Sequence, residues 1–211
     1  PMAAKARDVL GKLDAVEAYS ERVKLGAMFS NFTETTSIRV NGIDPVKETA
    51  TTPLLPGRIV EGSKTGALLG PGEILIPVLL ARGMKVKVGD TVVLVATNRE
   101  GSVNGKTFTV RAILESVTGP SGRDGYIRIE DAMSLLRMTQ PEISEIAVRL
   151  KDPAQLDRVY AQLSRELTGV AGSRGGSGVA AGEGAATELE VHTWAALSPF
   201  SNIANMIDLL T

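Results

Sequence analysis

The chain has 211 residues, of which 43% are hydrophobic, and it carries 23 basic against 24 acidic side chains. This length allows one domain or two small lobes. The balanced charge, with four Phe, three Tyr and one Trp, excludes the basic, aromatic surface typical of nucleic-acid binding. The absence of cysteine excludes disulfides, thiolate nucleophiles and cysteine-based metal sites.

Both ends of the chain predict amphipathic helices. The first lies within residues 3–16, and its apolar face consists of Ala6, Val9, Leu10 and Leu13. The last, Ser198–Thr211, has Ser198 as a possible N-cap and Pro199 at the first helical position. Neither helix ends in a closing glycine, as expected of a domain excised from something larger. They are either ordinary terminal helices packed on a core or stalks that lead to membrane spans outside this sequence, which itself has no run of about 20 apolar residues.

A sheet is expected to begin after the first helix. Residues Val16–Phe29 and Thr36–Ile43 read as two strands, and the second ends at the turn sequence Asn41–Pro45. The following residues, Pro53–Gly72, are rich in proline and glycine and contain no periodic run. They therefore predict a connection into a second lobe.

That second lobe is expected to consist mainly of short strands. Glu73–Ile76 predicts a strand, Pro77–Gly83 a short helix and Val86–Ala96 a buried strand. The polar residues Asn98–Lys106 predict a loop that contains Asn-Gly, and residues 107–112 then alternate between apolar and polar. The two strands around this loop are therefore predicted to form a hairpin.

The chain then alternates between strand and helix. Tyr126–Ile129 and Ile143–Leu150 read as strands, and between them Asp131 is expected to cap a helix. The clearest helix signal follows, with Asp152 as N-cap and Pro153 at the first helical position. The predicted fold class is therefore α+β.

A glycine-rich segment precedes the predicted terminal helix. Residues Gly169–Thr187 contain seven glycines, but neither the spacing of a P-loop nor that of a dinucleotide-binding turn. They predict a flexible surface loop. A short strand, Leu189–Val191, is expected to lead from this loop into Trp194 and the last helix.

The single histidine gives little support to catalysis. Because His192 is alone, a multi-histidine metal site is excluded, and a packed or surface imidazole is the ordinary interpretation. Ser198 and Ser201 lie nearby in the sequence, but no Gly-x-Ser-x-Gly elbow occurs.

Acidic side chains are the other catalytic candidates. Glu130 with Asp131, and Glu142 with Glu145, fall at predicted helix starts and strand edges, where solvated carboxylates are expected. We therefore expect a non-catalytic protein with no cofactor and no metal ion.

Six segments of the sequence, taken in order, resemble the periplasmic domains of a class of ABC transporter permeases. They are Val40–Glu48 (VNGIDPVKE), Gly57–Gly62 (GRIVEG), Ile74–Leu94, Phe108–Ile113 (FTVRAI), Asp124–Met138 and Ile143–Leu150. The class includes the lipoprotein-releasing permeases LolC and LolE, the efflux permease MacB, and FtsX. The Gly-Ile-Asp-Pro and Asp-Gly-Tyr sequences resemble the lipoprotein-releasing branch most closely. The resemblance covers nearly the whole chain apart from the glycine-rich segment.

The resemblance implies a MacB-like periplasmic core domain. Such a fold pairs a mixed α/β porter lobe with an inserted, smaller, β-rich sabre lobe, and its ends form stalk helices. Residues 1–60 would form the first part of the porter lobe with the N-terminal stalk. Residues 61–123 would form the sabre-like lobe. Residues 124–211 would complete the porter lobe, with the flexible loop 169–187 and the C-terminal stalk.

The resemblance also implies partners. The parent protein would be embedded in the bacterial inner membrane and dimeric, with this domain on the periplasmic side and a separate cytoplasmic ATPase subunit acting through the membrane part. A periplasmic adaptor or a lipoprotein chaperone would be the partner outside. The candidate partner-contact loop consists of Asn98, Arg99, Glu100, Ser102, Val103 and Asn104. This loop is shorter than the hook of chaperone-recruiting relatives and lacks its proline.

Two functions follow from the sequence. The first is a non-catalytic extracytoplasmic permease domain that couples cytoplasmic ATP hydrolysis to export or lipoprotein release. The second is a free-standing ligand-binding protein or hydrolase that uses a cleft between lobes. The resemblance favours the first.

Overall fold

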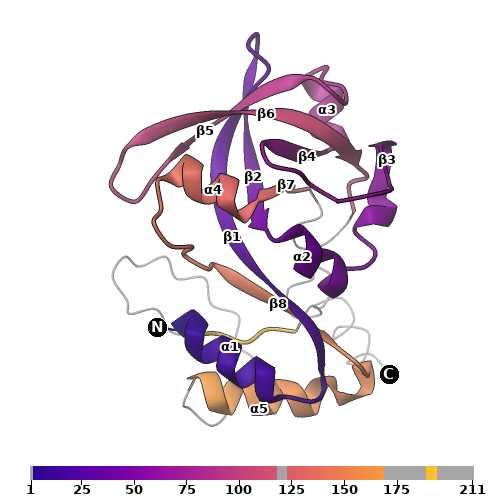
Figure 1. The fold of residues 1–211 in the computed structure, drawn as a ribbon, viewed down its shortest axis with the longest axis vertical. Coiled ribbons are helices and arrows are strands. Elements are labelled where there is room, and N and C mark those ends of the chain that lie inside the picture. The colour runs from indigo at the N-terminus through magenta and orange to yellow at the C-terminus, as the bar shows by residue number, and fades with distance from the viewer. Residues whose placement is uncertain (1, 118–122, 169–188, 194–211) are drawn as a thin grey trace, which may run out of the picture. The chain divides into compact units, whose positions relative to one another are not determined.

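The computed structural model describes residues 2–117, 123–168 and 189–193 (Figure 1). The strands in these ranges are β1 (Val16–Ser30), β2 (Thr35–Ile43), β3 (Ile59–Gly62), β4 (Glu73–Pro77), β5 (Thr91–Thr97), β6 (Val103–Leu114), β7 (Gly125–Arg128) and β8 (Glu145–Leu150). The helices are α1 (Met2–Lys12), α2 (Pro45–Thr51), α3 (Val78–Gly83), α4 (Ile129–Leu136) and α5 (Leu156–Thr168), with 3-10 turns η1 (Pro56–Arg58) and η2 (Pro153–Gln155).

Contacts between residues divide the chain into two compact units. The first comprises residues 1–17 and 150–211, and the second comprises residues 18–149. The chain passes from one unit to the other twice, once within β1 and once within β8. The boundaries expected from the sequence, after residues 60 and 123, do not coincide with this division, so the three-part lobe organisation stays a prediction.

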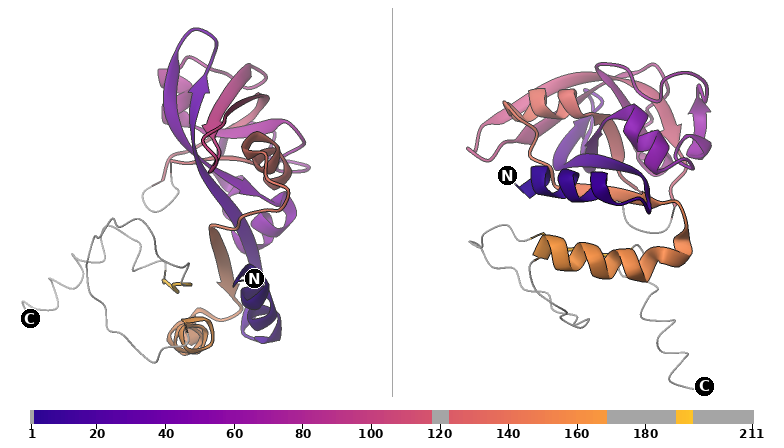
Figure 2. Two further views of the ribbon diagram at one scale, coloured as in Figure 1. Left: turned by 90° about the vertical axis from the view of Figure 1, so that its left-hand side faces the viewer. Right: turned by 60° about the horizontal axis from the view of Figure 1, so that its bottom comes forward.

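The first unit is built on two amphipathic helices. Helices α1 and α5 lie side by side and pack against each other (Figure 2). Their contact buries Ala6, Val9 and Leu10 of α1 and Val159 and Leu163 of α5. The apolar face predicted for the first helix is confirmed for Ala6, Val9 and Leu10, whereas Leu13 lies beyond the end of α1 and is only half-buried. The predicted Asp152 cap is present, since its carboxylate accepts a hydrogen bond from the Ala154 amide at 2.9 Å, but it caps the 3-10 turn η2 that leads into α5.

The second unit contains a closed circuit of six strands. Around it, β1 pairs antiparallel with β2, β2 parallel with β7, β7 antiparallel with β4, β4 parallel with β6, and β6 antiparallel with β5. The circuit closes where Met28–Ser30 of β1 pair with Val93–Val95 of β5. Strand β3 pairs with β6 outside this circuit, and β8 lies next to β1.

Apolar side chains fill both sides of this sheet. The main cluster joins alternate residues of β1, β2, β4, β5 and β6 to Ala132, Leu135 and Leu136 of α4, as period-two alternation requires. The second cluster lies on the other face of β2, β4, β6 and β7, where Leu55, Ile59 and Leu69 cover it. The segment Pro53–Gly72 is thus a packed cover with its own short strand, whereas the sequence predicted only a connection.

Helix α2 was not predicted from the sequence. It begins directly after β2, where the Asp44 carboxylate accepts hydrogen bonds from the amides of Val46 and Lys47, and Pro45 occupies the first turn. The Asp-Pro signal is the same one that identified the helix after Asp152, but here it was interpreted as a turn at the end of a strand.

The turn between β1 and β2 is held by side chains. The Asn31 amide oxygen accepts from the backbone N–H groups of Thr33 and Glu34, and its Nδ2 donates to the Met84 carbonyl at 2.8 Å. Phe32, which lies between Asn31 and Thr33 in this turn, has a φ of 71°, and its side chain is 68% exposed. A bulky side chain in the left-handed region is strained, so this turn holds Phe32 outward at a cost in backbone energy.

Four other predicted features differ from the structure. The predicted strand Val86–Ala96 begins only at Thr91, because Gly89 has φ 91° and the preceding residues form turns. Asp131 does not cap α4 but lies in its first turn, after Arg128 at the N-cap. The predicted strand Leu189–Val191 is absent, since residues 189–193 form neither strand nor helix. The predicted loop Asn98–Lys106 is a shorter turn, as detailed below.

Two predicted segments lie outside the described residues. These are the glycine-rich stretch up to Thr187 and the terminal helix Ser198–Thr211, including Ser198 and Ser201.

Candidate functional site

The predicted partner-contact loop is a tight turn between β5 and β6. The Asn98 side-chain oxygen accepts from the amides of Glu100 and Ser102, at 3.1 and 2.8 Å, and the Asn98 amide donates to the Ser102 carbonyl. Gly101 takes φ 83°, a conformation that favours glycine. These contacts fix the turn to residues 98–102.

Two of the six predicted partner-contact residues belong to strand β6 instead. Val103 pairs with Thr97 and Asn104 with Ala96, because the strand register continues to the turn. Val103 is 67% exposed, whereas Asn104 is buried and its side chain donates to the Ser102 carbonyl. Arg99 extends from the turn to Glu142, with 2.8 Å between Nε and Oε2. The exposed residues of the predicted contact loop are therefore Arg99, Glu100, Ser102 and Val103.

A buried cluster of charges surrounds Arg22, in the first half of β1. Arg22 makes two hydrogen bonds to the Glu48 carboxylate, with Nη2 at 2.6 Å and Nε at 3.1 Å, and its Nη1 lies 2.6 Å from Glu145 Oε1. The Glu48 side chain is fully buried and also accepts from the hydroxyls of Ser20 and Thr52. This cluster joins β1, α2 and β8.

The charges in this cluster stabilise one another. Burial alone would raise the pKa of Glu145, but hydrogen bonds and positive charge from Lys24 and Arg22 hold that pKa below its ordinary value. Burial likewise opposes the charge on Arg22, but the hydrogen bonds and negative charge of Glu48 outweigh it and raise the pKa of Arg22. Glu145 and Arg22 therefore stay ionised near neutral pH, and we call the cluster of Arg22, Glu48 and Glu145 the ionic clamp.

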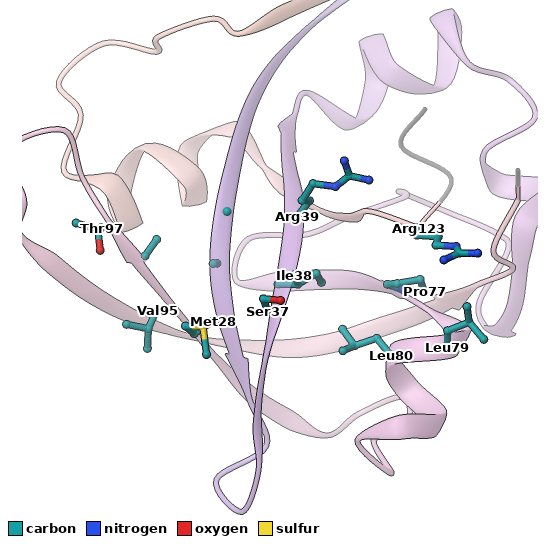
Figure 3. Close-up of a pocket in the computed structure, with 13 residues that line it drawn as sticks. Met28, Ser37, Ile38, Arg39, Pro77, Leu79, Leu80, Val95, Thr97 and Arg123 are labelled. Atoms are coloured by element: carbon teal, nitrogen blue, oxygen red, sulfur yellow. The ribbon is translucent and has the colours of Figure 1, made fainter. Parts of the chain in front are cut away.

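A groove of about 790 Å³ opens on the second unit, and its lining is largely apolar (Figure 3). Met28 and Val95 line one side, and Leu79 and Leu80 of α3 line the other (Figure 3). Met28 is 44% and Leu79 54% exposed. The groove also reaches core residues, since Ile38, Ala27 and Ala96 contribute to its lining.

Two arginines stand at one end of the groove. Arg39 comes from β2 and Arg123 from the residues before β7, and Figure 3 shows their side chains extending toward the same side. Asp124 Oδ1 lies 3.2 Å from Arg39 Nε, and Asn41 donates to Oδ2 of the same carboxylate. The Arg39 side chain is nevertheless 75% exposed. The two exposed arginines therefore give this end of the groove a positive surface, whereas the Asp124 carboxylate is buried.

The catalytic candidates are dispersed. His192 is exposed and its Nε2 lies 3.0 Å from Glu190. Asp131 has a structural role, since it accepts from the Gly72 amide and pairs with Lys106, each at 2.8 Å. Glu130 pairs with Arg128 on the surface. Within the part of the chain that the structure describes, no group of acidic or histidine side chains is arranged to hold a metal ion.

Sequence reasoning missed both the ionic clamp and the groove. The only local signal for the groove is Met28, an apolar residue at an outward position of β1, where the alternating residues Ala27 and Phe29 are buried. Arg22, Glu48 and Glu145 are far apart in the sequence, and nothing in their spacing links them.

Residues 2–166 match the family described as the MacB-like periplasmic core domain. No curated protein matches the chain. The fold is similar to the extracellular domain of the noncanonic ABC-type transporter YknZ from Gram-positive bacteria, with a TM-score of 0.53 and 17% identity over 77% of this chain and 81% of that one. It is also similar to the periplasmic region of MacB from Actinobacillus actinomycetemcomitans, with a TM-score of 0.52 and 13% identity over 80% of this chain and 74% of that one.

The family match spans α1 through most of α5, and so includes the whole of the second unit and part of the first. In the described ranges, no helix has the length and apolar character needed to cross a membrane. The chain therefore belongs to the MacB-like periplasmic core domain family and is an extracytoplasmic domain of an ABC transporter permease.

Proposed function

We propose that this domain transmits motion driven by cytoplasmic ATP hydrolysis to a partner or cargo outside the membrane, and that it is itself non-catalytic. The ATP would be hydrolysed by a separate subunit, and the parent permease would act as a dimer. Export or lipoprotein release, assisted by a periplasmic adaptor or chaperone, would be the outcome of this motion.

The ionic clamp on β1 and β8 is the observation that supports this proposal most directly. These two strands carry both connections to the unit that contains α1 and α5. Arg22 binds Glu145 of β8 and the buried Glu48 of α2 at the same time. A force arriving along either strand would therefore act on both, because a buried, hydrogen-bonded ion pair resists separation.

The turn between β5 and β6 is the proposed contact with an outside partner. The hydrogen bonds of Asn98 hold the backbone in one conformation, and the side chains of Arg99, Glu100, Ser102 and Val103 are exposed. A rigid turn that presents an apolar and a charged side chain loses little conformational entropy on binding. A photo-crosslinking residue at Arg99 should capture the partner in cells, whereas the same residue at the exposed Lys64 should not.

Coupling is tested in the intact transporter with its ATPase subunit. The variant Glu145→Gln removes the ion pairs to Arg22 and Lys24 but leaves Glu48 to neutralise Arg22. We expect ATP hydrolysis to continue while transport falls strongly, because hydrolysis would no longer be coupled to movement of the domain.

Glu130→Gln is the matched control, since it removes a surface ion pair to Arg128 and touches neither the clamp nor the proposed contact turn. This variant should transport normally. Normal transport by Glu145→Gln, in a protein whose isolated domain is folded, would contradict the proposed role of the clamp.

A further inference from the structure

We propose that the groove lined by Met28, Leu79 and Val95 binds a single-chain anionic amphiphile, with its aliphatic chain in the groove and its acidic headgroup at Arg39 and Arg123. This inference concerns binding by the domain alone and does not depend on the coupling role proposed above.

The lining of the groove suits an aliphatic chain. Met28 and Leu79 both line the groove and remain about half exposed. Their side chains are flexible and unbranched at the β-carbon, so they adapt to a chain of variable conformation. Burying these side chains against a hydrocarbon would remove apolar surface from water.

The charges at one end select an acidic headgroup. Arg39 and Arg123 supply two positive charges, and Asp124 supplies one negative charge, so the net charge of this end is positive. Asp124 Oδ1 receives no aligned hydrogen bond in spite of its 3.2 Å distance from Arg39 Nε. The N–H groups of Arg39 therefore make no aligned hydrogen bond to Asp124 Oδ1. Guanidinium groups bind carboxylates and phosphates through paired hydrogen bonds, so Arg39 can bind an acidic headgroup in this way.

An extended peptide is the competing occupant. The ladder between β2 and β7 begins only at Val40, so the outer edge of residues 35–39 has no strand partner among the described residues. Two features favour the amphiphile. The volume of about 790 Å³ lies within the range of small-molecule sites. The groove is also lined by Ile38 and Ala96, which belong to the main hydrophobic cluster, so an aliphatic chain would find apolar side chains there as well as a strand edge.

The experiment uses the full chain and four probes. Dodecanoate and dodecyltrimethylammonium, both below their micelle concentrations, share the chain and differ in charge. Inorganic phosphate tests the anion without a chain, and a soluble apolar hexapeptide tests strand addition. Calorimetry gives the affinity, and methyl and amide NMR shifts give the location.

We expect dodecanoate to bind, with shifts at the methyl groups of Met28, Leu79 and Leu80, and to bind at least about tenfold more tightly than either the cationic amphiphile or phosphate. The double variant Arg39→Gln/Arg123→Gln should lose about tenfold or more in affinity for dodecanoate, and Leu79→Gln should weaken binding as well.

Matched controls test whether these effects are local. Arg82→Gln removes an exposed arginine, and Leu54→Gln removes a leucine that is 81% exposed; neither residue lines the groove. Both variants should bind dodecanoate like the unmodified chain. All variants should unfold at similar denaturant concentrations, which excludes loss of fold as the cause.

Four results would overturn the proposal. These are no binding of dodecanoate, equal affinity for the two amphiphiles, an unchanged affinity in the double arginine variant, or shifts centred away from the groove. Tighter binding of the hexapeptide, with amide shifts in residues 35–39 and displacement of dodecanoate, would replace the amphiphile by a peptide.

Discussion

Replacement of Arg22 by methionine should destabilise the second unit strongly. The change leaves the Glu48 carboxylate fully buried and removes two of its hydrogen bonds, at 2.6 and 3.1 Å. Loss of one partner from a buried ion pair costs about 3–5 kcal/mol. Because Glu48 keeps the hydroxyl donors of Ser20 and Thr52, we expect Arg22→Met to fall near the lower value, about 3 kcal/mol.

Urea unfolding followed by circular dichroism measures this loss. For a slope of about 2 kcal/mol/M, a loss of about 3 kcal/mol lowers the midpoint by about 1.5 M. The control Lys12→Met breaks the pair with Asp8, whose side chains are 72% and 65% exposed, and should cost less than about 0.5 kcal/mol.

A second variant separates the cost of an unpaired charge from the cost of lost packing. In Arg22→Met/Glu48→Leu neither charge remains, and buried ion pairs replaced by apolar residues are often close to neutral. The hydroxyl of the buried Ser20 then loses its acceptor, which costs about 1–3 kcal/mol. The double variant should therefore be no less stable than Arg22→Met. Two results would refute this account. One is a double variant whose loss in unfolding free energy equals the sum of the losses in Arg22→Met and in Glu48→Leu; the other is a loss below about 1 kcal/mol for Arg22→Met.

Three further predictions follow from single positions. Because the pKa of Glu145 is lowered in the folded state, its ionised form stabilises that state above the ordinary pKa of 4.5. This stabilisation disappears as the pH falls through the lowered pKa. The urea midpoints of the unmodified chain and of Glu145→Gln should therefore converge below about pH 4.5. Phe32→Gly should raise the free energy of unfolding by about 0.5–1 kcal/mol because it relieves a positive φ, whereas Thr33→Gly, next to it, should lower that free energy; equal effects would argue against strain at Phe32. A Cβ at Gly42 would lie 2.6 Å from the Ala132 Cβ of α4, so Gly42→Ala should cost about 1–3 kcal/mol in a thermal or urea melt, and a neutral result would show that α4 shifts easily.

Predictions made from local sequence patterns were correct where a segment carried a single strong helix or strand signal. The apolar face of α1 is buried as its spacing indicated, and the Asp152 cap is in place. The strands β1 and β2 begin and end within one residue of the prediction. The same Asp-Pro signal at Asp44 was misread because it directly followed a strand, where a turn was the simpler interpretation.

Long-range features were beyond the reach of the sequence. The resemblance identified the family from the order of short segments, and the match over residues 2–166 confirms it. The nearer relationship to the lipoprotein-releasing branch stays a prediction, as does partner contact through the turn at Arg99. The ionic clamp and the groove were missed entirely, because each brings together side chains from three or more separate elements.

The sequence by itself indicated most of the helices and strands and the apolar face of α1, because these properties depend on neighbours within a few positions. Tertiary structure alone decided that β1 closes the sheet against β5, that Arg22 meets Glu48 and Glu145, and that Met28 and Leu79 line one groove. Contacts of this kind depend on strand order and register, which are set by the packing of the whole unit and leave no periodic signal in the chain.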